Sequence, residues 1–140
     1  MAIFNKINAF LLNLGEKVHD LRAAGDTLKV YLSNELPLAT DTVKADVAEI
    51  TAENGYPAGG TDIQNDWGEA GGVSSLTGVD VVFTGSGGSF GPFRYVPLYN
   101  DASVSPLDPL IGWWDYGSSI SIGDGETFTV DFGVTILQVS

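Results

Sequence analysis

The sequence has no cysteine and only one histidine among its 140 residues. Without cysteine, the chain forms no disulfide and offers no thiol nucleophile or thiolate metal ligand, so its stability does not depend on an oxidising compartment. A single histidine also excludes a histidine-rich zinc site. From these absences we expect no catalytic residue, no metal-binding residue and no cofactor.

Basic residues are scarce as well, and the formal net charge is −12. Residues 1–44 hold equal numbers of basic and acidic groups, whereas residues 45–140 hold Arg94 as their one cation against thirteen carboxylates. Such a surface repels nucleic-acid phosphates and anionic membranes, so we expect neither as a partner. The charge serves either solubility or the recognition of a basic partner surface.

Long apolar runs are also missing. No stretch reaches the ~20 apolar residues that a membrane span needs. Asn5, Lys6, Asn8 and Asn13 interrupt the apolar amino terminus, and no small-residue cleavage site follows it. We therefore expect no secretion signal and synthesis in a cytoplasm.

The amino-terminal segment has the spacing of an amphipathic helix over residues 2–23. Six apolar residues at alternating spacings of three and four form its stripe: Phe4, Ile7, Leu11, Leu14, Val18 and Leu21. Gly25 is a natural stop after the helix. The stripe either covers a side of the remaining domain or packs against a neighbouring subunit, and its first five members are candidate interface residues.

The remaining sequence has the pattern of a β domain. Alternating apolar residues and turn signals predict strands over 28–32, 79–83, 90–99, 110–116, 118–122, 126–132 and 134–139. Residues 54–78 contain seven glycines and predict a long loop with one or two short strands, while residues 42–50 fit a short helix or an extended loop. We expect one domain over 1–140, with the amphipathic helix in 1–24 and an antiparallel β-sandwich or jelly roll in 25–140.

Three features resemble functional motifs, and each has a structural alternative. The glycine-rich segment 85–91 lacks the lysine of a phosphate loop and precedes a strand, which favours a hairpin loop. His19 is a candidate base, although a lone helical histidine is more often a surface or interface residue. Six carboxylates lie in the aromatic-rich half of the chain: Asp101, Asp108, Asp115, Asp124, Glu126 and Asp131. A glycosidase needs two of them to face one cleft. The structural alternative is that they are solvated groups in turns and at strand edges.

Trp113 and Trp114 are adjacent on a predicted strand, so their side chains point to opposite faces. Either a second layer of the same chain covers the outer face, or one tryptophan anchors an intermolecular contact, a role in which tryptophan is enriched. Trp113, Trp114 and Tyr116 are therefore candidate interface residues. Arg94 is expected to pair with a carboxylate or to stack on an aromatic ring.

Six segments carry a family resemblance. They are F-N-K-I-N-A-F at 4–10, D-T-L-K-V-Y-L-S-N at 26–34, G-Y-P-A-G-G at 55–60, G-P-F-R-Y-V-P-L-Y-N-D at 91–101, L-I-G-W-W-D-Y-G at 110–117 and G-E-T-F-T-V-D-F at 125–132. With them the chain resembles the small head proteins of tailed bacteriophages, the capsid cement or decoration proteins of jelly-roll type. Residues 61–89 contribute least to this resemblance.

The resemblance implies a virion component without enzymatic activity, made in the host bacterial cytoplasm, which binds the outer capsid surface. Its implied partner is the major capsid protein, whose subunits it bridges to stabilise the head, as a homodimer or higher homo-oligomer on the shell. Alternatives from other classes are a fibre or spike domain that binds carbohydrate or a receptor, a neck or tail adaptor, and an enzyme.

Overall fold

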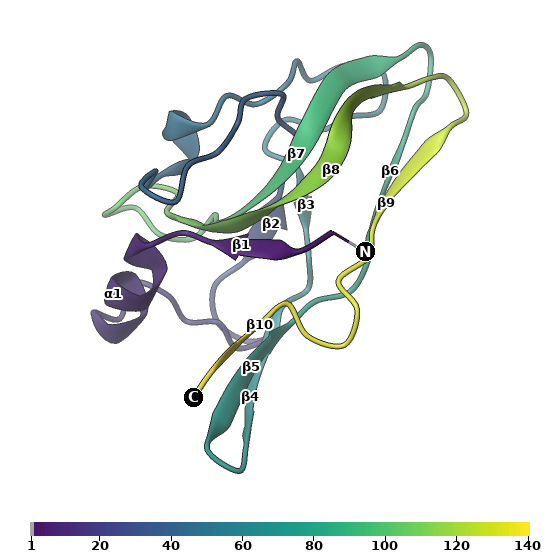
Figure 1. Cartoon of the computed structure of the whole chain (residues 1–140). Coiled ribbons are helices and arrows are strands. Elements are labelled where there is room, and N and C mark those ends of the chain that lie inside the picture. The colour runs from purple at the N-terminus through teal and green to yellow at the C-terminus, as the bar shows by residue number, and fades with distance from the viewer. Residues whose placement is uncertain (1) are drawn as a thin grey trace.

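The computed structural model describes residues 2–140, in which β-strands predominate (Figure 1). The strands are β1 (Phe4–Lys6), β2 (Leu28–Val30), β3 (Thr61–Asp62), β4 (Asp66–Ala70), β5 (Val73–Thr77), β6 (Val81–Thr84), β7 (Phe90–Asn100), β8 (Leu110–Ile122), β9 (Thr127–Val130) and β10 (Leu137–Val139). The helical elements of these residues are α1 (Ala9–Gly15) and a short 3-10 helix, η1 (Lys44–Asp46). The expected mainly β class, with antiparallel sheets and one α-helix, is confirmed.

The long hairpin of β7 and β8 is the spine of the largest sheet (Figure 1). That sheet has the strand order β1-β8-β7-β2-β3, and all neighbouring strands are antiparallel. In its register, Val96 lies opposite Trp114 and Pro97 lies opposite Trp113. Because successive strand residues point to opposite faces, the two tryptophans lie on opposite faces of the sheet.

Two smaller sheets complete the fold, one with the order β10-β5-β4 and one formed by β6 and β9. Figure 1 shows the β6–β9 ribbon beside the β7–β8 hairpin, and the Phe93 and Phe128 rings meet there with centroids 4.8 Å apart. This arrangement is consistent with a β-sandwich. The jelly-roll topology stays a prediction.

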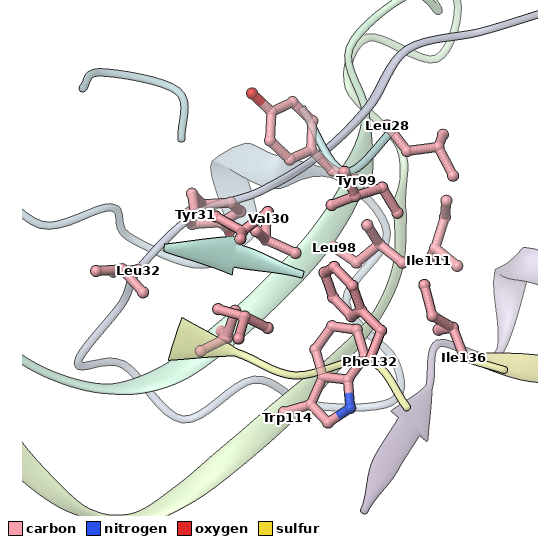
Figure 2. Packing of buried hydrophobic residues seen from close by; sticks show 14 of the residues in the cluster. Leu28, Val30, Tyr31, Leu32, Leu98, Tyr99, Ile111, Trp114, Phe132 and Ile136 are labelled. Carbon is pink, nitrogen blue, oxygen red and sulfur yellow. The ribbon is translucent and has the colours of Figure 1, made fainter. Parts of the chain in front are cut away.

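Six consecutive residues of β7, numbers 95–100, are buried. A strand with one covered face alternates buried and exposed residues, so this unbroken run shows that protein covers both faces of the spine. On one face the Trp114 ring packs between Phe4 and Phe132, with ring centroids 4.8 and 5.3 Å away. Figure 2 shows Trp114 beside Phe132, with Leu98 and Ile136 in the same cluster.

The other face is covered in part by the long segment between β2 and β3, which tyrosine hydroxyl groups fasten to the sheet. The Tyr31 hydroxyl donates to the carbonyl of Val47 at 2.9 Å, and the Tyr99 hydroxyl donates to the carbonyl of Gly59 at 2.6 Å. Burial raises the pKa of both phenols well above the ordinary value, so both stay protonated donors. Buried tyrosines commonly need such a partner for the hydroxyl.

Glu49 gathers the remaining polar contacts of this covering segment. Its carboxylate accepts hydrogen bonds from Lys44 Nζ at 2.9 Å, the Tyr56 hydroxyl at 2.6 Å and the Gly59 N–H at 2.7 Å. The Tyr56 oxygen in turn accepts from the N–H of Leu32 at 3.1 Å. A half-buried carboxylate with three donors is well compensated for the loss of water, so this cluster holds the segment in one place.

The predicted amino-terminal helix over 2–23 is wrong in length. β1 and α1 occupy 4–6 and 9–15, and irregular turns follow up to residue 27. Pairing with the edge of β8 outweighs the helical spacing, because it places Phe4 opposite Trp114 and satisfies backbone groups of both strands. Gly112 permits this approach, since a Cβ there would collide with the Phe4 ring.

The predicted apolar stripe therefore does not lie on one helical face. Ile7 precedes α1 and Val18 follows it. Within the helix, Phe10 is fully buried, whereas Leu11 and Leu12 are 46% and 64% exposed. The short helix packs through a different side from the one that the spacing predicted.

Most predicted strands agree with the structure within a few residues, with two differences. Residues 54–78 were expected to hold one or two short strands, around Ile63 and over Val73–Leu76, and they contain three: β3, β5 and the unexpected β4. The expected break between strands 110–116 and 118–122 is absent, since β8 runs through Gly117, which adopts a φ of +101°. Residues 42–50 form η1 and otherwise loop.

Replacing Trp114 by Ala should lower the free energy of unfolding by about 3–5 kcal/mol, the usual cost of deleting a buried aromatic side chain. Urea unfolding of the purified variant measures this. Trp113→Ala is the matched comparison and should cost less, because Trp113 is only half-buried. A smaller loss for Trp114→Ala than for Trp113→Ala would contradict this assignment of the core.

Candidate interaction surface

An aromatic groove opens where the largest sheet meets the β6–β9 ribbon. It has a volume of about 190 Å³ and is lined by Ala2, Val96, Trp114, Tyr116, Phe128, Thr129, Val130 and Asp131. Trp114 is only 7% exposed and forms its floor, whereas Tyr116 is 52% exposed. The Tyr116 ring meets the Phe128 ring edge-on at 5.5 Å, so Phe128 holds this exposed tyrosine in position.

The groove exists because β8 and β9 belong to different sheets. No backbone ladder joins them at this seam, and side chains alone fill the space between them. Aromatic rings from the two sheets meet there but leave the outer part open. The result is an apolar hollow with a phenol at its rim, which suits a flat or apolar group of a partner molecule.

The three predicted interface residues of β8 have different surroundings. Trp114 is buried and Trp113 is half-buried against the core, so layers of the same chain cover Trp114 and part of Trp113. Tyr116 alone keeps an exposed ring. Phe128 completes the groove but was not predicted as an interface residue. Its contact with Tyr116 joins strands of two different sheets, and no local sequence pattern shows that these strands lie side by side.

The five predicted interface residues of the amino-terminal segment do not form one surface. Phe4 packs on Trp114, and Ile7 is buried in the core. Leu14 and Val18 are half-buried. Leu11 is the exposed member, and its neighbour Leu12, which the stripe left out, is more exposed still.

The sequence led us to expect that Arg94 pairs with a carboxylate or stacks on an aromatic ring, and the structure shows both contacts. Its Nε lies 2.8 Å from Asp115 Oδ1 and its Nη2 lies 3.1 Å from Oδ2, which is a bidentate pair. The guanidinium carbon lies 5.4 Å from the centroid of the Tyr95 ring. Hydrogen bonds from Arg94 hold the pKa of Asp115 below its usual range, and the pair lies on β7 and β8 next to Tyr116.

Most basic side chains are already paired with a carboxylate. Within residues 2–140 the ion pairs are Arg22–Asp20, Lys29–Asp101, Lys44–Glu49 and Arg94–Asp115. These pairs involve four of the six Lys and Arg residues of the chain, which has 18 carboxylates. The surface that a partner meets is therefore acidic.

His19 is buried rather than on a helix surface, and it is part of a polar network. The Asn100 amide nitrogen donates to Asp26 Oδ2 at 2.7 Å, and the Asn100 oxygen accepts from the N–H of Ala102 at 2.9 Å. These contacts fix the orientation of the amide, so its nitrogen also donates to His19 Nδ1, 3.0 Å away. The imidazole is then neutral, with its proton on Nε2.

This environment does not position His19 as a base. Burial lowers the pKa of His19 to about 4, against a smaller upward effect of Asp26. Nδ1 is occupied by Asn100, and the buried Nε2 has no hydrogen-bond partner among the described residues. The histidine is thus a structural member of the core that links residues 19–26 to the end of β7.

The carboxylates proposed for a glycosidase pair have separate roles. Asp115 and Asp101 are in ion pairs. Asp124, Glu126 and Asp131 accept hydrogen bonds from the backbone N–H groups of turns. The pKa of Asp108 is raised by burial and by the nearby charge of Asp101. These contacts fit turn and edge groups, and residues 2–140 contain no cluster of three or more His, Cys, Asp or Glu side chains arranged for a metal ion.

Residues 87–91 match the G-x-S-x-G pattern of a nucleophile elbow, with Ser89 at its centre. The pattern needs a strand before it and a helix after it to expose the serine. Here the segment leads from β6 directly into β7, and the carbonyl of Ser89 accepts a hydrogen bond from the Asn54 amide at 2.7 Å. The segment is a turn between two strands, as the glycine-rich composition predicted.

No protein-family model, curated protein or solved structure matches this chain. Among residues 2–140, no helix has the length and apolar character to cross a bilayer.

Replacing Arg94 by Ala should lower the melting temperature slightly, since the pair with Asp115 is bidentate but partly exposed and screened by solvent. Thermal unfolding of the variant at low salt measures the loss. Lys17→Ala is the control, because Lys17 is exposed and forms none of the ion pairs among the described residues. A melting temperature equal to that of the wild type would show that the pair contributes nothing.

The stability of the fold should also decrease on acidification between pH 6.5 and pH 4. The pKa of His19 is about 4 when folded and about 6.5 when exposed, so the unfolded chain binds the proton first. The stabilisation that comes from keeping His19 neutral is fully present above pH 6.5. About 3 kcal/mol of the free energy of unfolding is lost by pH 4. Urea unfolding across this range tests it, with His19→Gln as the variant that should lack this slope. An identical slope in both proteins would assign the loss to other groups.

Proposed function

We propose that the chain is a non-enzymatic structural protein of a tailed-bacteriophage virion. In this proposal it binds the outer capsid surface, bridges neighbouring major capsid subunits and stabilises the head. The homodimer or higher oligomer expected on the shell is part of the same proposal. Its basis is the resemblance of six sequence segments to capsid cement proteins, together with the surface described above.

The observation that carries the proposal is the exposed Tyr116 ring at the rim of the aromatic groove. Tyrosine and tryptophan are the side chains most enriched at energetically dominant contacts, because they bury a large rigid area and retain a polar tip. Phe128 already holds the ring in place, so little conformational entropy is lost when a partner covers it. The groove supports a docking function better than a chemical one.

Three of the six segments that carry the resemblance line this groove. Segment 91–101 supplies Val96, segment 110–117 supplies Trp114 and Tyr116, and segment 125–132 supplies Phe128 and Val130. They are distant in the sequence but line one hollow. The likeness to cement proteins therefore coincides with the surface that is best suited to bind a partner.

Charge adds a second constraint on that partner. The net charge of −12 favours a basic surface and disfavours association with nucleic acid. Many weak contacts of this kind, repeated over a shell, bind the subunits together by multivalency. Placement on the outside of the capsid is consistent with such a surface.

A carbohydrate-binding or receptor-binding module is the second candidate, because an exposed tyrosine beside a groove also suits stacking on a sugar ring. The two functions differ in copy number. A cement protein is present in amounts comparable to the major capsid protein, whereas a fibre or spike domain is scarce. A stained gel of purified particles separates them.

Tyr116→Ala should weaken binding to capsid shells about 30-fold, which corresponds to a contact of about 2 kcal/mol. The test mixes purified protein with expanded shells that lack it and measures bound protein by sedimentation. Val79→Ala is the matched control, since Val79 is exposed to a similar extent, 53%, but does not line the groove. The proposed function fails if the wild-type protein does not bind these shells.

A further inference from the structure

A second exposed surface lies at one end of the molecule, away from the aromatic groove. Three segments contribute six of its side chains, which are between 46% and 81% exposed and which we call the apolar end: Leu11, Leu12, Leu36, Leu38, Val104 and Leu107. Single exposed apolar residues are normal on a protein surface, but a group of large ones from adjacent segments marks an interaction site.

Backbone hydrogen bonds show that the three segments are neighbours. The N–H of Asn8, at the start of α1, donates to the carbonyl of Ala39 at 2.9 Å. On its other side the same loop meets the β7–β8 connection, where the N–H of Lys44 donates to the backbone carbonyl of Asp108 at 2.8 Å and Val43 forms a β-bridge with Pro109. Figure 1 shows α1, the loop after β2 and the β7–β8 connection gathered on one side of the molecule.

Local contacts hold these loops in shape. Asp41 accepts a hydrogen bond from the N–H of Leu38 at 2.8 Å, and its own N–H donates to the carbonyl of Leu38 at 2.9 Å. In the β7–β8 connection, Val104 and Leu107 form a bridge, and the Ser103 hydroxyl donates to Pro106 at 2.7 Å. The apolar side chains are therefore displayed by folded turns, and binding costs little ordering of the backbone.

The charges around the apolar end define the chemistry of its partner. Segments 8–16, 34–43 and 101–109 contain no Lys or Arg and five carboxylates: Glu16, Glu35, Asp41, Asp101 and Asp108. Lys29 pairs with Asp101 and the flanking Lys44 pairs with Glu49, so the flanking Lys17 faces the four other carboxylates, which remain in excess. A second copy of the chain would bring the same excess of carboxylates against this one, and an anionic membrane would meet the same repulsion. Charge complementarity instead selects an apolar socket on another protein with Lys or Arg at its rim.

The apolar end and the aromatic groove are well separated on the spine. Leu110, at the base of the β7–β8 connection, and Tyr116, at the groove, are six residues apart on β8, which corresponds to about 20 Å at ~3.3 Å per residue. Two docking surfaces at such a distance suit a protein that joins two neighbouring subunits.

From these observations we infer that the apolar end is a second docking surface, which binds a cation-rimmed apolar socket on a neighbouring shell subunit. The identity of that subunit rests on the proposed function, whereas the chemistry of the socket follows from the surface itself. With both surfaces engaged, the chain is a bivalent clamp, and loss of one surface removes the gain in avidity.

The test compares two triple variants of the full chain for binding to expanded shells that lack the protein. The first carries Leu36→Ser, Leu38→Ser and Leu107→Ser at the apolar end. The control carries Val79→Ser, Val82→Ser and Val134→Ser, which are between 53% and 90% exposed and lie elsewhere. The first variant should raise the half-saturating concentration about 100-fold, the lower range of an avidity effect, and the control should stay within about 3-fold of the wild type.

Melting curves establish whether both triple variants fold. If the apolar-end triple variant does not fold, the single variant Val104→Ser, at an 81% exposed position, replaces it. Equal binding of the wild type and the apolar-end variant would overturn this inference and leave the proposed function intact. Absence of wild-type binding would overturn both. Two further measurements test the other possible partners of the apolar end. Light scattering detects a dimer, and sedimentation with phosphatidylcholine vesicles detects membrane binding. Either one, if lost in the apolar-end variant alone, would also overturn the inference.

Discussion

The fold depends on the need to cover both faces of β7. Its residues 95–100 are buried without a break, so each face of the β7–β8 spine needs its own layer. Phe132 and Ile136 come from the chain after β9 to cover the face that carries Trp114. The segment between β2 and β3 covers the other face, where buried tyrosine hydroxyls and Glu49 compensate its polar backbone. Six of the large apolar side chains that neither layer buries lie at the apolar end, and Tyr116 lies at the rim of the aromatic groove. We therefore propose these two surfaces as the ones that meet a partner.

The sequence predicted the strands of the spine well, because alternation and turn residues are local signals. It failed where a distant contact decided the local structure. Phe4 and Ile7 have helical spacing with Leu11, yet β1 forms because the edge of β8 offers Phe4 backbone partners and a space above Gly112. No local pattern contains that information. β4 was missed for a similar reason, since Asp66–Ala70 is almost wholly exposed and gains its order from the hairpin with β5.

The candidate site was predicted in part. The opposite orientation of Trp113 and Trp114 followed from strand geometry alone. Arg94 was expected to pair with a carboxylate or to stack on an aromatic ring, because it is the one cation beside thirteen carboxylates in residues 45–140 and aromatic residues flank it. The sequence did not show that Trp114 is covered and Trp113 partly covered, which leaves Tyr116 as the most exposed of the three rings. Nor did it bring Leu36, Leu38 and Leu107 together. A usable signal was present there, because apolar residues beside Pro37 and Pro106 lie in loops that have little access to a core.

We propose, as the basis of both docking surfaces, that one small acidic domain joins two shell subunits. The most direct measurement is a cryo-electron microscopy map of expanded shells saturated with the purified chain. The account predicts one copy in contact with two capsid subunits, with Tyr116 against one of them and the loop of Leu36 and Leu38 against the other. A copy that touches a single subunit, or shells without added density, would contradict it.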